Sequence, residues 1–238
     1  MTDRRLPHGE ADDADAVHRY SETPPGAFTL RSAGYRASSA KHAAQDSAFE
    51  LMGAEAYRSA RATRRRAPEP GSVLEVARRA GDDRRYIVVN FVCPGRPSDL
   101  NFVLYFAERG PRGTAGAALE RFMESPPDDD EYRRERFKLL PSCPQGPWLI
   151  RKALGRPAIV ARKLDTTFER GDSYVEVTVD VGSSMVARRL QTLIFSALAG
   201  LVIDIGFTVE GRTDDELPER LIGGCRVHRV DMRQLVDG

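Results

Sequence analysis

The sequence predicts an α+β fold in which a bent antiparallel sheet of about six to eight strands wraps around one long apolar helix. Three observations support this class. Short runs rich in β-branched and aromatic residues recur between turns that contain Pro and Gly. The stretch 190–203 carries no charge, which is typical of a buried core helix. Hydrophobic residues make up 41% of the 238 residues, which fits a globular domain and excludes a wholly disordered chain.

The beginning of the chain differs in composition from the rest. Residues 1–25 are mostly polar and charged, and the segment closes with Pro24, Pro25 and Gly26. Such a segment buries too little apolar surface to offset the entropy lost on ordering. We therefore expect a disordered tail over 1–25 and a single domain over 26–238.

The first part of that domain contains three expected segments. Residues 27–36 alternate apolar and polar side chains and predict a strand. Residues 47–59 predict a helix with one apolar side. Residues 61–85 are rich in arginine and are interrupted by Pro68, Pro70 and Gly71, so a solvated loop is expected there.

A hairpin and two helices are expected in the middle of the chain. Residues 84–95 and 100–108 are short, apolar and joined by turn residues, which indicates two antiparallel strands. A helix is expected over 117–125. Another is expected over 128–140, where acids precede bases in the order that the helix dipole favours.

The last part of the chain predicts strands around one long helix. Strands are expected over 146–155, 156–171, 173–182 and 225–232. The third of these alternates cleanly, which indicates one buried and one wet face. The helix is expected from Met185 to about Phe207, with Ser183 or Ser184 as its N-cap.

The charge of the chain is nearly balanced overall but uneven locally. The net charge of +1 gives no support to nucleic-acid binding. Between residues 132 and 170, however, ten basic residues face three acidic ones. Four of the basic residues are expected on adjacent strands, where they form a cationic surface for an anionic lipid head group: Arg151, Lys152, Arg162 and Lys163. The alternative is a solvated face balanced by the acidic runs 120–131 and 210–219.

The long apolar helix also has two interpretations. Packed tightly on the sheet it is part of the core, and gripped loosely it leaves an apolar pocket for a lipid tail. In the second case the apolar part of the site is expected to be lined by Trp148, Phe195 and Phe207.

No residue pattern indicates catalysis. Cys93, Cys143 and Cys225 form no CxxC pair, so neither a zinc site nor a disulfide framework is expected. Ser183 and Cys143 are the remaining candidates for a hydrolase nucleophile, and helix capping accounts for the serine. We expect a non-enzymatic protein without cofactor or metal.

The expected location is intracellular, either cytoplasmic or peripheral to a membrane. The N-terminal residues contain no apolar region of the kind that marks a secretory signal. The uncharged stretch of 14 residues is short for a membrane span.

Several sequence blocks, in this order, resemble one known family. They are RFKLLP (136–141), GPW with IRK (146–152), DVGSS with VAR (180–188) and DDELPERLIG (214–223). The chain from about 26 to 235 is similar to the C-terminal domain of the plant Enhanced Disease Resistance 2 proteins, a domain of unknown function.

The resemblance implies a membrane setting without defining a ligand. In the plant proteins this domain follows a pleckstrin-homology domain that recognises phosphatidylinositol 4-phosphate and a START lipid-binding domain, and the whole proteins restrain cell death. We expect a stand-alone copy here, as in algae and other protists, so phosphoinositide recognition is not carried over. A START-like helix grip is the expected form of the fold.

The sequence leaves two functional hypotheses. The leading one is a lipid-associated or membrane-peripheral binding module whose partner is an anionic lipid or membrane surface. The alternative is a structural or accessory subunit of a larger assembly, in an organelle or elsewhere, that binds a protein partner and no ligand of its own. The charged tail and the arginine-rich loop 61–85 support the alternative, because such segments can order on a partner.

Overall fold

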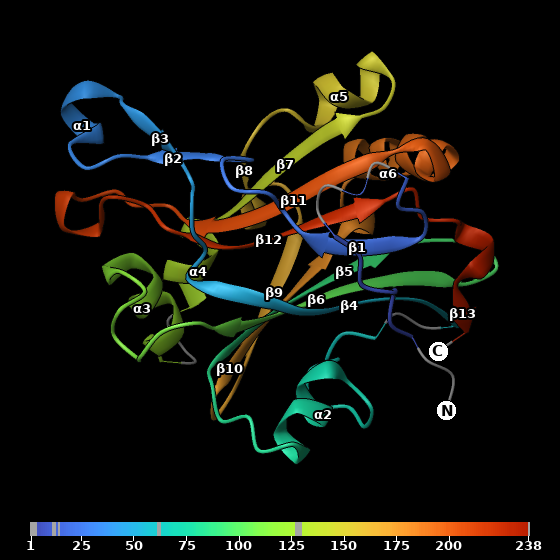
Figure 1. Cartoon of the computed structure of the whole chain (residues 1–238), viewed down its shortest axis with the longest axis horizontal. Helices are drawn as coiled ribbons and strands as arrows, with labels where there is room; N and C mark the ends of the chain where they lie inside the picture. The colour runs from blue at the N-terminus through green and yellow to red at the C-terminus, as the bar shows by residue number, and fades with distance from the viewer. Residues whose placement is uncertain (1–3, 11–12, 14, 61–62, 127–129, 238) are drawn as a thin grey trace.

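In the computed structural model, which describes residues 4–10, 13, 15–60, 63–126 and 130–237, two β-sheets pack on one another, and helices lie around them, with α2 (Val73–Arg79) against the outer face of one sheet (Figure 1). The first sheet has the order β1 (Arg19–Glu22), β12 (Leu221–His228), β11 (Val202–Val209), β7 (Phe137–Gln145) and β8 (Ala158–Ile159). The second has the order β13 (Val236–Asp237), β4 (Phe49–Ser59), β6 (Asp99–Glu108), β5 (Tyr86–Cys93), β10 (Tyr174–Asp180) and β9 (Asp165–Gly171). A separate hairpin joins β2 (Thr29–Arg31) and β3 (Lys41–Ala43).

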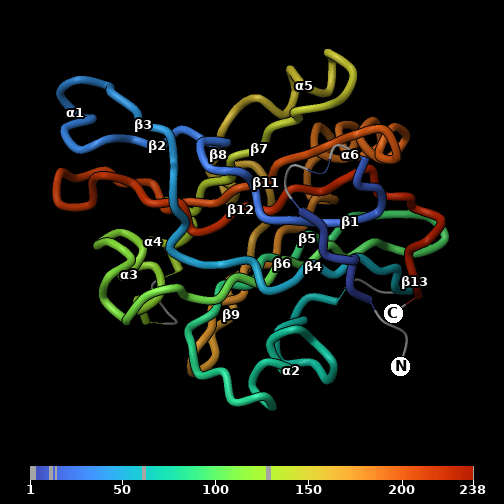
Figure 2. Tube along the Cα trace, viewed as in Figure 1, coloured from blue at the N-terminus to red at the C-terminus, as the bar shows by residue number. Residues whose placement is uncertain are grey.

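The helices are short and lie around the sheets. The α-helices are α1 (Tyr35–Ser38), α2 (Val73–Arg79), α3 (Ala117–Glu124), α4 (Asp130–Arg136), α5 (Trp148–Leu154) and α6 (Met185–Ala197). The 3-10 turns are η1 (Val160–Arg162), η2 (Val181–Ser183), η3 (Leu198–Gly200), η4 (Asp214–Glu216) and η5 (Met232–Gln234). Figure 2 shows α5 and α6 at one side of the molecule, and α1 with the β2–β3 hairpin at the other.

The α+β class is confirmed, but the expected single antiparallel sheet is wrong. The sequence pattern located the β5–β6 hairpin and α3 correctly. Two strand pairs are parallel, however, β10 with β5 and β13 with β4. Aromatic side chains join the two sheets, as where Phe106 of β6 meets Phe207 of β11 with ring centroids 5.8 Å apart. The core therefore lies between two sheets and not around one helix.

The long helix expected up to Phe207 ends at Ala197. After η3 the chain becomes β11, which pairs with both β7 and β12. A short run that is buried on all sides is apolar throughout, whether it forms a helix or a strand. It therefore shows no periodicity that distinguishes the two structures. The uncharged stretch 190–203 is divided between the two kinds of element.

Two other segments take the opposite secondary structure from the one expected. Residues 49–59 form the strand β4 and not a helix, because both of its faces are covered and almost every residue is at least partly buried. Residues 148–154 form α5 and not a strand. Its buried side chains, Ile150 and Leu154, are four residues apart, the spacing of one helix face.

Within 156–171, the strand β9 starts only at Asp165. Likewise α4 ends at Arg136, and the rest of the expected 128–140 helix is β7, while Asp128 and Asp129 lie outside the described residues.

The expected tail and the expected solvated loop both contribute to the core where the structure describes them. In the segment 1–25, β1 pairs with β12, and Leu6 and Ala16 are buried. In the arginine-rich segment, Arg66 and Ala67 are buried, and α2 follows. In both segments, apolar contacts and hydrogen bonds with the rest of the domain offset the entropy lost when the segment becomes ordered.

The arginine-rich segment covers the face of β10 that was expected to be wet. Glu176 of β10 is fully buried, and its carboxylate accepts hydrogen bonds from the backbone N–H groups of Arg66 and Ala67 at 2.8 Å. Thr178 donates to the carbonyl of Arg64. Groups of the arginine-rich segment and Asn90 thus satisfy the polar face of the strand.

Candidate ligand cavity and adjoining surface

An apolar cavity of about 260 Å³ lies between the two sheets and beside α6. Side chains from both sheets line it, among them Leu139, Ile203, Ile205 and Val227 of the first sheet and Phe91, Leu100 and Phe102 of the second. Phe91, Phe102, Leu139 and Ile205 are only partly buried although they belong to inner strands. The two sheets therefore diverge at this end and leave apolar side chains without full packing.

Helix α6 forms one wall of the cavity. Its N-cap is Ser184, whose hydroxyl accepts a hydrogen bond from the N–H of Ala187, as the sequence predicted. Leu190, Ile194 and Phe195 line the cavity at spacings that place them on one side of the helix. Phe195, which the sequence placed in the apolar part of a lipid site, lines this cavity.

The other two aromatic residues expected in the site lie elsewhere. Phe207 is fully buried in the core, where its ring stacks on that of Phe137 with centroids 5.4 Å apart. Trp148 is 69% exposed on α5. Both predictions rested on a helix to residue 207 and on a strand at 148, and both elements differ in the structure.

Four large apolar side chains are exposed on α5 and α6, which contact one another. They are Trp148 (69% exposed), Leu149 (57%), Met185 (69%) and Val186 (77%). Both helices also line the cavity, α5 through Leu154 and α6 through its apolar side. We call these four residues, together with the basic residues described next, the α5–α6 surface.

The basic residues of the α5–α6 surface are Arg151, Lys152, Arg188 and Arg189, and all four are exposed. In the described part of the chain, none of them lies within ion-pair distance of a carboxylate. The ammonium of Lys152 lies 4.9 Å from the ring centre of Trp148. The surface thus combines exposed apolar groups with positive charges that have no ion-pair partner among the described residues.

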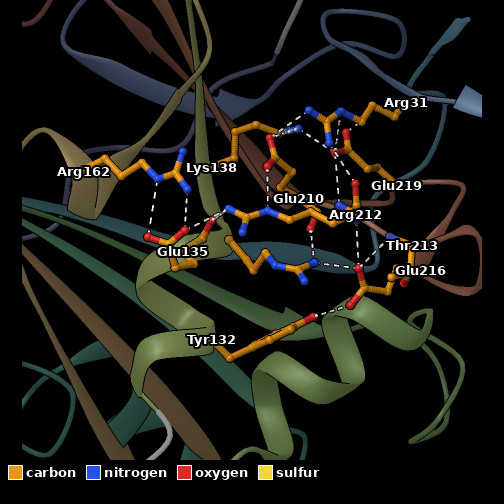
Figure 3. A network of polar contacts seen from close by, with 12 residues as sticks. Arg31, Tyr132, Glu135, Lys138, Arg162, Glu210, Arg212, Thr213, Glu216 and Glu219 are labelled. Carbon is orange, nitrogen blue, oxygen red and sulfur yellow. Dashed lines mark hydrogen bonds and ion pairs between the residues drawn. The ribbon is translucent and has the colours of Figure 1, made fainter. Parts of the chain in front are cut away.

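Arg162, unlike the four basic residues of the α5–α6 surface, has an ion-pair partner. It forms an ion pair with Glu135, which also pairs with Arg212 at 3.2 Å (Figure 3). Lys163 is exposed and follows η1. The predicted adjacency of Arg151–Lys152 and Arg162–Lys163 on neighbouring strands is wrong, because the first pair is on a helix and the second is at a 3-10 turn.

The network of Figure 3 explains two of the sequence blocks. Arg136 and Lys138 of RFKLLP pair with Glu216 and Glu219 of DDELPERLIG, each with nitrogen and oxygen 2.6 Å apart. Lys138 is 8% exposed and Glu219 is 2% exposed. These ion pairs connect β7 to the turn before β12. We therefore assign the charged residues of both blocks a role in stabilising the fold and not in binding a ligand.

The carboxyl of Glu216 has a strongly shifted pKa. Burial alone would raise it, but the backbone N–H of Arg212 and the guanidinium of Arg136 stabilise the ionised form and lower the pKa of Glu216 from 4.5 to about 2. A lowered pKa in the folded state stabilises the protein above the ordinary pKa, and this contribution is lost as the pH falls through the folded value.

Glu216→Gln is expected to lower the free energy of unfolding by about 3 kcal/mol near neutral pH. The difference from the unaltered protein should shrink as the pH falls from about 4.5 through about 2, below which the carboxyl is protonated in both states. Urea unfolding at a series of pH values measures it. Asp214→Asn, on the same turn but with a side chain 71% exposed, is the control and should change stability little. A pH-independent loss in Glu216→Gln would contradict the role of its charge.

The residues considered as nucleophiles have structural partners. The Ser183 hydroxyl donates to the carbonyl of Asp180 and accepts from the N–H of Asp165. Cys143 is buried, and burial raises the pKa of its thiol. Within the described residues, no group of three His, Cys, Asp or Glu side chains is arranged to hold a metal ion. Over the same residues, no helix has both the length and the apolar character needed to cross a membrane.

Together these features define an α+β protein with an apolar cavity between two packed sheets and an apolar, cationic surface beside it. The chain belongs to the family described as "Protein ENHANCED DISEASE RESISTANCE 2, C-terminal", which matches residues 20–231. It is similar to "Protein ENHANCED DISEASE RESISTANCE 2-like" from Arabidopsis thaliana, with 36% identity over 150 residues. That match covers 63% of this chain and 20% of the relative, so the matched part spans about a fifth of the plant protein. No solved structure matches.

Proposed function

We propose that this domain is a non-enzymatic lipid-binding module that holds an apolar chain between its two sheets and meets a membrane through the α5–α6 surface. The observation that carries the proposal is the cavity. A concave apolar space that is accessible from solvent often marks a ligand site. A space of about 260 Å³ bounded by Phe, Leu, Ile and Val side chains is suited to an apolar occupant.

The volume sets the size of that occupant. An engineered apolar cavity of about 150 Å³ stays dry and binds benzene, so by proportion the present cavity holds roughly ten carbon atoms. Each methylene moved from water into such a site contributes about 0.8 kcal/mol. The proposed ligand is therefore one chain or compact apolar body and not a lipid with two long tails. We include a START-like grip in the proposal, with α6 as the helix that closes the site.

The α5–α6 surface supplies the proposed route to a membrane. Trp148 and Val186 project apolar groups into solvent, and the neighbouring cations favour an anionic leaflet. Each basic residue near such a leaflet contributes about 1 kcal/mol. The ligand would then enter where both helices border the cavity.

Filling the cavity tests the proposal. Leu190→Trp enlarges a side chain of α6 that lines the cavity, and it is expected to weaken binding of medium-chain lipids by about tenfold or more, because excluding two methylenes already costs about 1.6 kcal/mol. Native mass spectrometry and displacement of a fluorescent fatty-acid probe measure the loss.

Thr192→Trp is the matched control for this experiment. Residue 192 lies on the exposed side of the same helix, so the same large side chain there should leave lipid binding unchanged. Equal binding by Leu190→Trp and the unaltered protein would show that the cavity is not the site. If the unaltered protein takes up no lipid and instead purifies with a stoichiometric protein partner, the accessory-subunit hypothesis is preferred.

A further inference from the structure

The N-terminal segment 4–9, which we call the strap, connects the two sheets. At its start it pairs with β4 of the second sheet, where the N–H of Leu6 donates to the carbonyl of Ala54 at 2.9 Å. At its end it pairs with β1 of the first sheet, where the N–H of Gly9 donates to the carbonyl of Tyr20 at 2.7 Å. Each part makes a second backbone hydrogen bond to the same strand. The strap is therefore held in place by both sheets.

Leu6, in the middle of the strap, lines the apolar cavity and is only 4% exposed. The hydrogen bonds on either side of it fix the position of its backbone. Ala56 of β4, Val227 of β12 and Leu235 before β13 also line the cavity and are buried. Packed side chains thus close the cavity on this side.

The cavity is more open on the opposite side of the two sheets. In the first sheet, β1 is the edge strand beside the strap, and β12 and β11 separate it from β7. The lining residues Leu139 and Pro141 of β7 are only partly buried, as are Leu164 before β9 and Val181 after β10. Helix α5, which carries part of the α5–α6 surface, follows β7 and contacts it. The cavity therefore runs across the strands, from the side of α5 to a closed end at the strap.

The order of the strands gives the length of this path. Neighbouring strands lie about 4.8 Å apart, so the distance from β7 across β11 and β12 to β1 is about 14 Å. The volume of the cavity admits roughly ten carbon atoms, and an extended chain of that size has a similar length. One chain that lies across the strands thus ends against Leu6.

We propose that Leu6 forms the floor of the cavity and sets the length of the apolar chain that the domain accepts. This inference rests on the proposed lipid-binding function and specifies its substrate class, which is amphiphiles with one chain of medium length. The head group stays outside, on the side of α5, because the lining is apolar almost throughout. Carbon atoms beyond the length of the cavity remain in water and add nothing to the affinity.

A series of saturated fatty acids, from about eight to about sixteen carbon atoms, tests the inference. For the unaltered protein, the affinity should rise about fourfold with each added methylene and should level off near about ten carbon atoms. We call the chain length at which the affinity levels off the length limit. Displacement of a fluorescent fatty-acid probe measures each affinity.

Two substitutions of Leu6 should move the length limit in opposite directions. Leu6→Ala shortens the side chain at the floor, so the limit should move to chains about three carbon atoms longer. A chain of about thirteen carbon atoms should then bind this variant at least about tenfold more tightly than the unaltered protein. Leu6→Phe enlarges the side chain and should move the limit to shorter chains. The opposite shifts keep the test decisive if one of the two variants does not fold.

Leu154→Ala is the matched control, because it makes the same change in a lining residue of α5, at the other end of the cavity. It should weaken the binding of every chain without moving the length limit to longer chains. A limit that is absent, that is the same in both Leu6 variants, or that moves equally in Leu154→Ala would overturn the role of Leu6 while leaving lipid binding intact. Binding of no fatty acid to the unaltered protein would overturn the proposed function itself.

Discussion

Changing Arg151 and Lys152 together to glutamate is expected to weaken binding to phosphatidylserine-containing vesicles by at least about thirtyfold. Each lost basic residue removes about 1 kcal/mol of attraction to the leaflet, and each new acid adds repulsion. Both side chains are exposed, and neither has an ion-pair partner in the described part of the fold, so the substitution should leave the core untouched. Vesicle flotation across a range of salt concentrations measures the effect, which should shrink as salt screens the charges.

A control variant with the same change in net charge distinguishes binding through the α5–α6 surface from a general electrostatic attraction between the protein and the vesicle. Lys41→Glu with Arg112→Glu alters two exposed cations, one on β3 and one just before α3. These elements lie on the other side of the molecule from α5 and α6 (Figure 2). This double variant should bind nearly as well as the unaltered protein. An equal loss in both variants would contradict a defined membrane-facing surface, and a surface that binds no vesicle at all would favour a protein partner.

Arg66→Ala is expected to lower the free energy of unfolding by about 3 to 5 kcal/mol, because it leaves a buried carboxylate without its partner. Arg66 is 1% exposed, and Glu55 is fully buried. The Nε of Arg66 donates to one carboxylate oxygen of Glu55 at 2.7 Å and its Nη2 to the other at 3.1 Å. Tyr105 donates a third hydrogen bond to the same carboxylate. Urea unfolding measures the loss.

The same substitution at Arg79 is the control. Arg79 belongs to the same arginine-rich segment and pairs with Glu75, but its side chain is 77% exposed, so Arg79→Ala should cost less than about 1 kcal/mol. Equally small effects at both positions would mean that the segment around Arg66 is not held on the second sheet in solution. A large difference would show that this segment is part of the domain and not a region awaiting a partner.

Local signals in the sequence predicted the elements in which pattern and burial agree. The β5–β6 hairpin is two short apolar runs around turn residues, and α6 begins at a serine that caps it. The pattern failed for buried apolar runs that, unlike β5 and β6, are not joined to a second such run by a short turn. In β4 and β11, nearly every residue is buried, so no alternation marks the strand.

The residues of the candidate cavity and of the α5–α6 surface were predicted less completely than the fold class, because their positions depend on packing. Phe195 lines the cavity because it lies on the apolar side of α6, which the sequence located. The exposed Met185 and Val186 and the buried Gln191 depart from the expected apolar core helix, and only packing shows which side of the helix each one occupies.

The sequence by itself determined the α+β class, the family and the local excess of basic residues between 132 and 170, because these depend on composition and on the order of short segments. Only the tertiary structure decided which charges are neutralised. Arg162 and Lys138 enter ion pairs with Glu135 and Glu219, residues distant in the chain, whereas Arg151 and Lys152 remain exposed beside Trp148. Electrostatic neutralisation depends on distance in space. The pairing of β7 with β8 brings Arg162 to Glu135, and the pairing of β11 with both β7 and β12 brings Lys138 to Glu219.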